Sequence, residues 1–405
     1  MGKTTIAAVI VCLASGLLMP LGAQNGPGGN PNENLKSTEV LPDGRVIFRI
    51  YAPKASEVSL SGDWVLHGRG TAGAMKKGSD GVWSLTVGPL VPDFYEYSFT
   101  VDGVRTADPK NMQMETSVES INNILEVPGP GEEFEATNPV PHGEIRQVFY
   151  QSSILGQTRR MHIYTPPGYN TSQEKYPVLY LINGGGQEDS GWSSMGRAGF
   201  IMDNLIAANK AKPMIVVMPN GTVSLPGITP AMIAREAQRT PEGNSIRVAS
   251  LAKLHEAFID DLMTKIIPYT EKNYSVLTGP DQRAVAGLSM GGQETIRAGI
   301  GRFGQFGYLG VWSMGPQPGF NGPFLEDFEQ RNAEFFRDPA HTNKVVKLLW
   351  IGVGRDDYTV GKGPKHLADG LEKHGINFEY HETQGGHTWI NWRQYLNEFA
   401  PRLFR

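Results

Sequence analysis

The sequence predicts an α/β domain, in which helices cover both faces of a mostly parallel sheet, preceded by a β-sandwich domain. Two patterns support this fold class. In residues 37–127, short stretches of alternating apolar and polar residues are separated by Asp-Gly turns, which is typical of antiparallel strands. In residues 143–405, apolar runs alternate with helix-like segments. Residues 128–142 are rich in Pro and Gly, so we place a linker there.

Hydrophobic periodicity locates the elements of both domains. The strands of the first domain are expected at residues 45–51, 57–61, 82–87 and 95–101. Those of the second are expected at residues 147–152, 160–164, 176–182, 214–218, 283–288, 309–312, 345–353 and 378–382. Its helices are expected at residues 200–210, 255–272, 293–301, 324–336, 364–374 and 392–399.

The N-terminal residues 1–23 are predicted to be a secretory signal peptide, because a lysine precedes a short apolar run that ends in Gly and Ala. A retained membrane anchor is the alternative. The single cysteine, Cys12, lies inside this segment, so the mature chain would have no disulfide and no cysteine nucleophile. Residues 24–36 are expected to be a flexible leader. We therefore expect a secreted or periplasmic protein.

The net charge of the chain excludes no class of enzyme, and it does not point to a polyanionic partner. The 405 residues carry a formal net charge of −4. A balance of this kind provides no argument for nucleic acid or an anionic membrane surface as partner.

A serine stands at the centre of residues 287–292, Gly-Leu-Ser-Met-Gly-Gly, between an expected strand and an expected helix. This context predicts a nucleophile elbow, in which a tight turn pushes the hydroxyl of Ser289 out of the sheet. The flanking glycines are expected because side chains would collide in so sharp a bend. A second serine, Ser313, also follows an apolar run but lacks the glycine two residues before it.

A serine hydroxyl needs a histidine to take its proton and an acid to orient that histidine. In chain order the acid and the histidine follow the serine, on loops after later strands. His387, in the run Gln-Gly-Gly-His-Thr-Trp just past the last expected strand, is the candidate base. Asp356 and Asp357 both follow the expected strand 345–353, and local spacing does not choose between them.

An oxyanion hole requires two backbone N–H groups. One is expected from Met290, the residue after the serine, and the other from a glycine-rich loop after an earlier strand. Residues 183–187, Asn-Gly-Gly-Gly-Gln, have that position, and Gly185 is the candidate donor. The chemistry predicted from these groups requires no metal and no organic cofactor.

With these motifs in place, residues 148–404 resemble the esterase D-like hydrolases of carbohydrate esterase family 1, which have the α/β-hydrolase fold. The resemblance lies in residues 184–192, 212–221, 286–292 and 385–389. The family places its acid last in a Gly-x-x-Asp pattern, which implies Asp357. The chain departs from the family at Asn183, where a histidine is common; the hole should still form, because its donors are backbone groups.

The first domain is similar to early-set, immunoglobulin-like modules related to family 48 carbohydrate-binding modules. The similar motifs are Tyr-Ala-Pro at residues 51–53, Ser-Gly-Asp-Trp at 61–64 and Tyr-Glu-Tyr at 95–97. A glycan-binding accessory domain is one interpretation. A module that only packs against the second domain is the other.

Together the two resemblances imply a secreted serine esterase, most similar to feruloyl esterases that act on plant cell-wall xylan. An acetylxylan esterase and a siderophore esterase of the enterochelin type share the same fold, and an inactive glycan-binding protein is an alternative of another class. Three tryptophans lie close in the sequence to the loops that carry the candidate site residues: Trp192, Trp312 and Trp389. We expect them to line an aromatic acyl pocket or, alternatively, to belong to the core.

Overall fold

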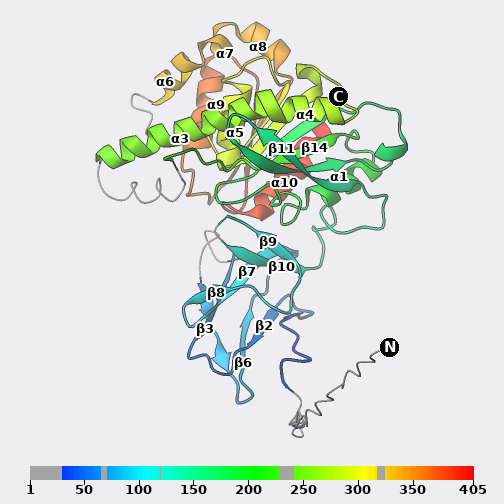
Figure 1. Ribbon diagram of the computed structural model, residues 1–405, viewed down its shortest axis with the longest axis vertical. Helices are drawn as coiled ribbons and strands as arrows, with labels where there is room; N and C mark the ends of the chain where they lie inside the picture. Colours follow the sequence, from blue (N-terminus) through cyan, green and yellow to red (C-terminus); the bar gives the residue numbers. More distant parts are fainter. Residues whose placement is uncertain (1–29, 65–70, 119, 229–240, 317–323) are drawn as a thin grey trace, which may run out of the picture.

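The computed structural model describes residues 30–64, 71–118, 120–228, 241–316 and 324–405 (Figure 1). The predicted signal peptide, residues 1–23, lies outside the described residues. The chain forms a β-sandwich followed by a larger α/β domain, as the sequence predicts. No helix in the described ranges has the length and apolar character needed to cross a bilayer.

The first domain consists of two antiparallel sheets. One sheet has the order β1-β2-β6-β5, and the other has the order β4-β3-β7-β10-β9 with β8 added beside β7. The strands are β1 (Thr38–Val40), β2 (Val46–Tyr51), β3 (Val58–Gly62), β4 (Thr71–Ala74), β5 (Lys76–Lys77), β6 (Val82–Val87), β7 (Asp93–Val101), β8 (Val104–Thr106), β9 (Met114–Thr116) and β10 (Ile121–Val127). Alternate residues of β2, among them Val46 and Phe48, are buried between the sheets, which accounts for the alternation in the sequence.

The strand β10 was not predicted, because its residues do not alternate in polarity. Asn122 and Asn123 are buried in the middle of it. The side chain of Asn123 accepts a hydrogen bond from the Asp108 amide (2.6 Å) and donates one to the Asn111 carbonyl (2.8 Å). Burial of these amides is possible because each polar atom has a partner.

The second domain is built on an eight-stranded sheet with the order β11-β12-β14-β13-β15-β16-β17-β18. The strands from β13 to β18 are parallel, and the hairpin β11–β12 adds two antiparallel strands at one edge. The strands are β11 (Glu144–Ser152), β12 (Gln157–Thr165), β13 (Val178–Ile182), β14 (Ile215–Pro219), β15 (Arg283–Leu288), β16 (Tyr308–Trp312), β17 (Leu348–Gly354) and β18 (Glu379–Thr383). The predicted strand 345–353 started too early, because α8 extends to Val345.

Helices cover both faces of this sheet (Figure 1). They are α1 (Ala198–Ala207), α3 (Pro241–Asp261), α4 (Ile267–Asn273), α5 (Met290–Gly299), α6 (Phe324–Arg331), α7 (Ala333–Arg337), α8 (Pro339–Val345), α9 (Gly363–Lys373) and α10 (Trp389–Phe399). Side chains of the fully buried β13 alternate between two core clusters: Tyr180 belongs to the cluster shared with α3, α5 and α9, and Leu181 to the cluster shared with α1 and α10. A sheet buried on both faces produces the continuous apolar runs seen in the sequence.

A fully buried arginine joins the two domains. Arg393 of α10 donates to the carbonyl oxygens of Phe94 (2.9 Å) and Met195 (3.0 Å). Its guanidinium also pairs with Asp93 of β7 and, at 2.5 Å, with Glu135. Glu135 lies in the predicted linker and is itself buried, so this part of the linker is packed into the joint.

Replacing this arginine tests how much the joint contributes to stability. Arg393→Met is expected to lower the free energy of unfolding by about 3–5 kcal/mol, because the change leaves the carboxylate of Asp93 without its cation and breaks the hydrogen bonds of the joint. Arg402→Met is the matched control: its partner Glu379 is partly exposed, so the loss should stay within about 1 kcal/mol. Urea unfolding followed by tryptophan fluorescence measures both. Equal losses in the two variants would show that Arg393 does not hold the domains together.

Candidate active site

Ser289 occupies a sharp turn between β15 and α5. Its backbone has φ 52° and ψ −116°, a combination that residues with a side chain rarely adopt. Such a conformation costs about 1–3 kcal/mol and persists only when the surroundings enforce it. The Ser289 amide donates to the Trp312 carbonyl at the end of β16 (2.9 Å), which fastens the turn to the neighbouring strand.

The glycines around the serine are required by close backbone contacts. A methyl group on Gly287 would lie 2.5 Å from the Gly291 carbonyl carbon, and one on Gly291 would lie 2.4 Å from the Ile182 carbonyl oxygen. Both distances are too short for any side chain. The structure therefore has the strand, turn and helix that the Gly-x-Ser-x-Gly pattern predicts.

His387 and Asp357 form a direct contact. The Nδ1 atom of His387 lies 2.9 and 3.0 Å from the two carboxylate oxygens of Asp357. The Asp357 side chain is completely buried, and the imidazole is 15% exposed. A donated Nδ1–H leaves Nε2 free to accept a proton. Asp356, in contrast, is exposed, so the geometry selects Asp357 as the partner of the histidine.

The sheet order brings these loops to one edge. Ser289 follows β15, Asp357 follows β17 and His387 follows β18, and the strands from β15 to β18 are parallel neighbours. The His387 ring stands edge-on to Trp392 with centroids 5.0 Å apart, and the Trp392 indole donates to Ser313 Oγ (3.0 Å). No direct hydrogen bond joins Ser289 to His387 among the described contacts; such bonds are often long before substrate binds.

The loop after β13 lies against the serine turn. A methyl group on Gly184 would lie 3.6 Å from Ser289 Cβ, and one on Gly185 would lie 3.8 Å from Met290 Cβ. The Gly184 amide is already bonded to Gln187 Oε1 (3.0 Å). Gly185 is exposed and its amide has no acceptor in the described part of the chain. Met290 begins α5, where N-terminal amides lack partners within the helix.

Comparison with known proteins agrees with this geometry. The esterase family model matches residues 152–403, which is more than half of the chain. The chain belongs to the esterase family. Residues 34–114 match the model of carbohydrate-binding module 48, the isoamylase N-terminal domain.

Relatives of both parts of the chain are known. An endo-1,4-beta-xylanase/feruloyl esterase from Xylanibacter ruminicola is 33% identical over 374 residues, which cover 90% of this chain and 46% of that protein. The chain spans about half the length of the curated relatives it matches. A ferulic acid esterase from Anaeromyces mucronatus, solved with ferulic acid, is 25% identical with a TM-score of 0.56, covering 68% of this chain and 96% of that one.

A further solved structure extends the likeness of fold to both domains. The enterobactin esterase of Shigella flexneri, solved with 2,3-di-hydroxy-N-benzoyl-serine, has a TM-score of 0.61 and 18% identity. The match covers 89% of this chain and 95% of that one. At this identity the likeness concerns the fold alone.

The three tryptophans that were expected to line an aromatic acyl pocket are buried in the core, so that prediction is corrected. Trp192, Trp312 and Trp389 are at most 2% exposed. The Trp192 ring lies edge-on to both Trp312 (5.5 Å) and Trp389 (5.1 Å). These tryptophans lie close to the loops of the candidate site, but their rings are buried in the core beneath it. Ser313 is likewise fully buried, which excludes it as a nucleophile.

Two residues that shape the histidine loop escaped sequence analysis. Asn391 donates from Nδ2 to the Gln384 carbonyl (2.6 Å) and to Thr383 Oγ1 (2.7 Å), which fixes the loop that carries His387. Trp392 covers the edge of the imidazole. Both lie on α10, and no local sequence pattern marks their contacts with the histidine loop.

The backbone strain at Ser289 has a measurable consequence. The free energy of unfolding of Ser289→Gly is expected to exceed that of Ser289→Ala by about 1 kcal/mol, because glycine adopts a positive φ without cost. At Ser84, in the middle of β6, the order should reverse and the alanine variant should be the more stable one. Urea titration of the four variants makes the comparison. A less stable glycine variant at position 289 would contradict the strained turn.

Proposed function

We propose that the chain is a serine carboxylic-ester hydrolase in which Ser289 is the nucleophile, His387 the general base and Asp357 the acid that orients the histidine. The observation that carries the proposal is the buried Asp357–His387 contact beside a strained serine turn at one edge of the sheet. Membership of the esterase family supports it.

The reaction proceeds as two acyl transfers. Ser289 Oγ attacks the ester carbonyl while His387 Nε2 takes its proton, and the negative oxygen of the tetrahedral intermediate is bound by the amides of Gly185 and Met290. The C–O bond to the alcohol then breaks, and His387 returns the proton to the leaving oxygen. Water, deprotonated by His387, then attacks the carbonyl of the acyl-enzyme. The bond to Ser289 Oγ breaks, His387 returns the proton to that oxygen, and the free acid leaves. Asp357 keeps the proton on Nδ1 throughout.

The substrate we propose is a hydroxycinnamate ester of cell-wall xylan. The relative from Xylanibacter ruminicola carries the name xylanase/feruloyl esterase and matches across both domains, and the Anaeromyces mucronatus enzyme was solved with ferulic acid. Export by the predicted signal peptide would bring the enzyme to a polymer outside the cytoplasm. The first domain, similar to immunoglobulin-like carbohydrate-binding modules, would then have a glycan as its partner.

The proposed triad predicts a set of variant activities. Ser289→Ala and His387→Ala should each reduce kcat on p-nitrophenyl acetate by roughly 10³-fold or more and to a similar level, because the three groups act as a unit. Asp357→Asn should lose roughly 10²-fold or more, whereas Asp356→Asn, which changes an exposed side chain beside it, should stay within about twofold. If Asp356→Asn were the more damaging change, the acid would be misassigned.

The substrate is tested with three esters given to the unaltered enzyme. Methyl ferulate, acetylated xylan and a catechol trilactone represent the feruloyl, acetyl and siderophore activities. We expect turnover of methyl ferulate and release of ferulate from arabinoxylan. Turnover of acetylated xylan alone would replace the feruloyl assignment with an acetyl one. Failure of a fluorophosphonate probe to label Ser289 would favour an inactive glycan-binding protein.

A further inference from the structure

The β-sandwich domain contacts the loop that carries the proposed oxyanion donor. Between β9 and β10, Ser117 pairs with Gln187 as an isolated antiparallel bridge, and the Val118 amide donates to the Gly186 carbonyl (2.9 Å). Gly186 is the residue directly after Gly185. The first domain therefore reaches the backbone of the oxyanion loop itself.

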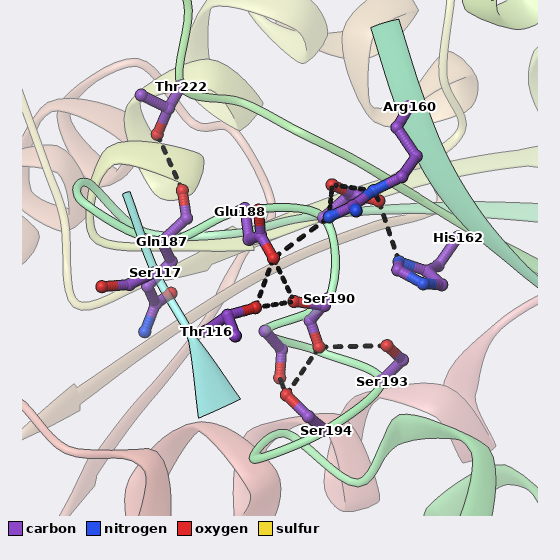
Figure 2. A network of polar contacts seen from close by, with 12 residues as sticks. Thr116, Ser117, Arg160, His162, Gln187, Glu188, Ser190, Ser193, Ser194 and Thr222 are labelled. Atoms are coloured by element: carbon purple, nitrogen blue, oxygen red, sulfur yellow. Dashed lines mark hydrogen bonds and ion pairs between the residues drawn. The ribbon is translucent and has the colours of Figure 1, made fainter. Parts of the chain in front are cut away.

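A side chain adds to these backbone contacts. Thr116 Oγ1, at the end of β9, donates to Glu188 Oε1 (2.5 Å), and the same carboxylate oxygen accepts from Ser190 Oγ (2.9 Å). Figure 2 shows Thr116 and Ser117 lying beside the loop segment that contains Gln187, Glu188 and Ser190.

The esterase domain holds the other side of the same loop. Arg160 of β12 forms a two-pronged contact with Asp189 at 2.8 to 3.1 Å and pairs with Glu188 at 3.0 Å (Figure 2). His162 lies 2.9 Å from the Asp189 carboxylate. Burial opposes ionisation of Asp189, but the contacts with His162 and Arg160 outweigh it and hold the pKa of this carboxyl below its usual range. The contact is therefore ionised at neutral pH.

These contacts matter because the loop is rich in glycine. It contains three consecutive glycines, and Gly186 has φ 80°, a region that favours glycine. Glycine backbones lose the most conformational freedom when they are fixed in one geometry. Donors in an oxyanion hole stabilise the transition state only when they are already aimed at the developing charge.

We propose that Thr116 and the Val118 amide of the β-sandwich domain are positioning groups for the oxyanion hole, acting through Glu188 and Gly186 on the amide of Gly185. This inference rests on the proposed esterase chemistry. In this arrangement the first domain is a structural part of the active site as well as a candidate glycan-binding module.

The test compares full-length variants on p-nitrophenyl acetate, a probe that does not depend on the natural substrate. Thr116→Val should lower kcat roughly threefold and Val118→Pro, which removes the amide proton, roughly tenfold, with KM changed less than about twofold. Inactivation by a fluorophosphonate, whose adduct places an oxygen in the hole, should slow by similar factors. Thr86→Val, at an exposed position of β6 in the same domain, is the matched control and should leave both rates unchanged.

The outcomes separate this inference from the function on which it rests. Wild-type protein that neither hydrolyses the ester nor reacts with the probe would overturn the esterase proposal. Active wild-type enzyme with unchanged rates in both variants would overturn the positioning role alone. A lower thermal midpoint with raised KM and unchanged kcat would also overturn it, because that pattern indicates a purely structural contact.

Discussion

The close approach of backbone segments at the serine turn is the constraint on which the site depends. Gly287, Gly291 and the carbonyl of Ile182 meet at distances that admit only hydrogen atoms. Because β13 and β15 are hydrogen-bonded neighbours, this contact also sets the loop after β13 against the turn after β15. Ser289 and the glycine-rich loop are therefore brought together by the packing of two adjacent strands.

Local sequence patterns predicted much of the fold and the candidate site. The strand, turn and helix around Ser289 follow from a short run of glycines and apolar residues, and the two-domain architecture follows from a change of period along the chain. Spacing alone did not decide which aspartate orients the histidine, since Asp356 and Asp357 are adjacent. Burial decides between them: Asp357 faces inward against His387, while Asp356 faces solvent.

What the sequence did not reveal depends on contacts between distant segments. The sequence around Trp192, Trp312 and Trp389 would look the same whether these rings faced a ligand or the core. Only their packing shows that Trp192 contacts the other two rings. The contact of residues 116–118 with the glycine-rich loop after β13 joins segments about seventy positions apart. No periodicity or motif reports such a pairing.

The joint around Arg393 has one guanidinium for two carboxylates, Asp93 and Glu135. Burial raises the pKa of Glu135 to about 8; Arg393 opposes this shift and Asp93 adds to it. In the unfolded chain the same carboxyl ionises near pH 4.3. The folded state thus retains a proton that the unfolded state releases, and its stability decreases as the pH rises from about 4.3 toward 8. The contribution of Glu135 to the seam between the domains is therefore present in acidic solution and lost by about pH 8.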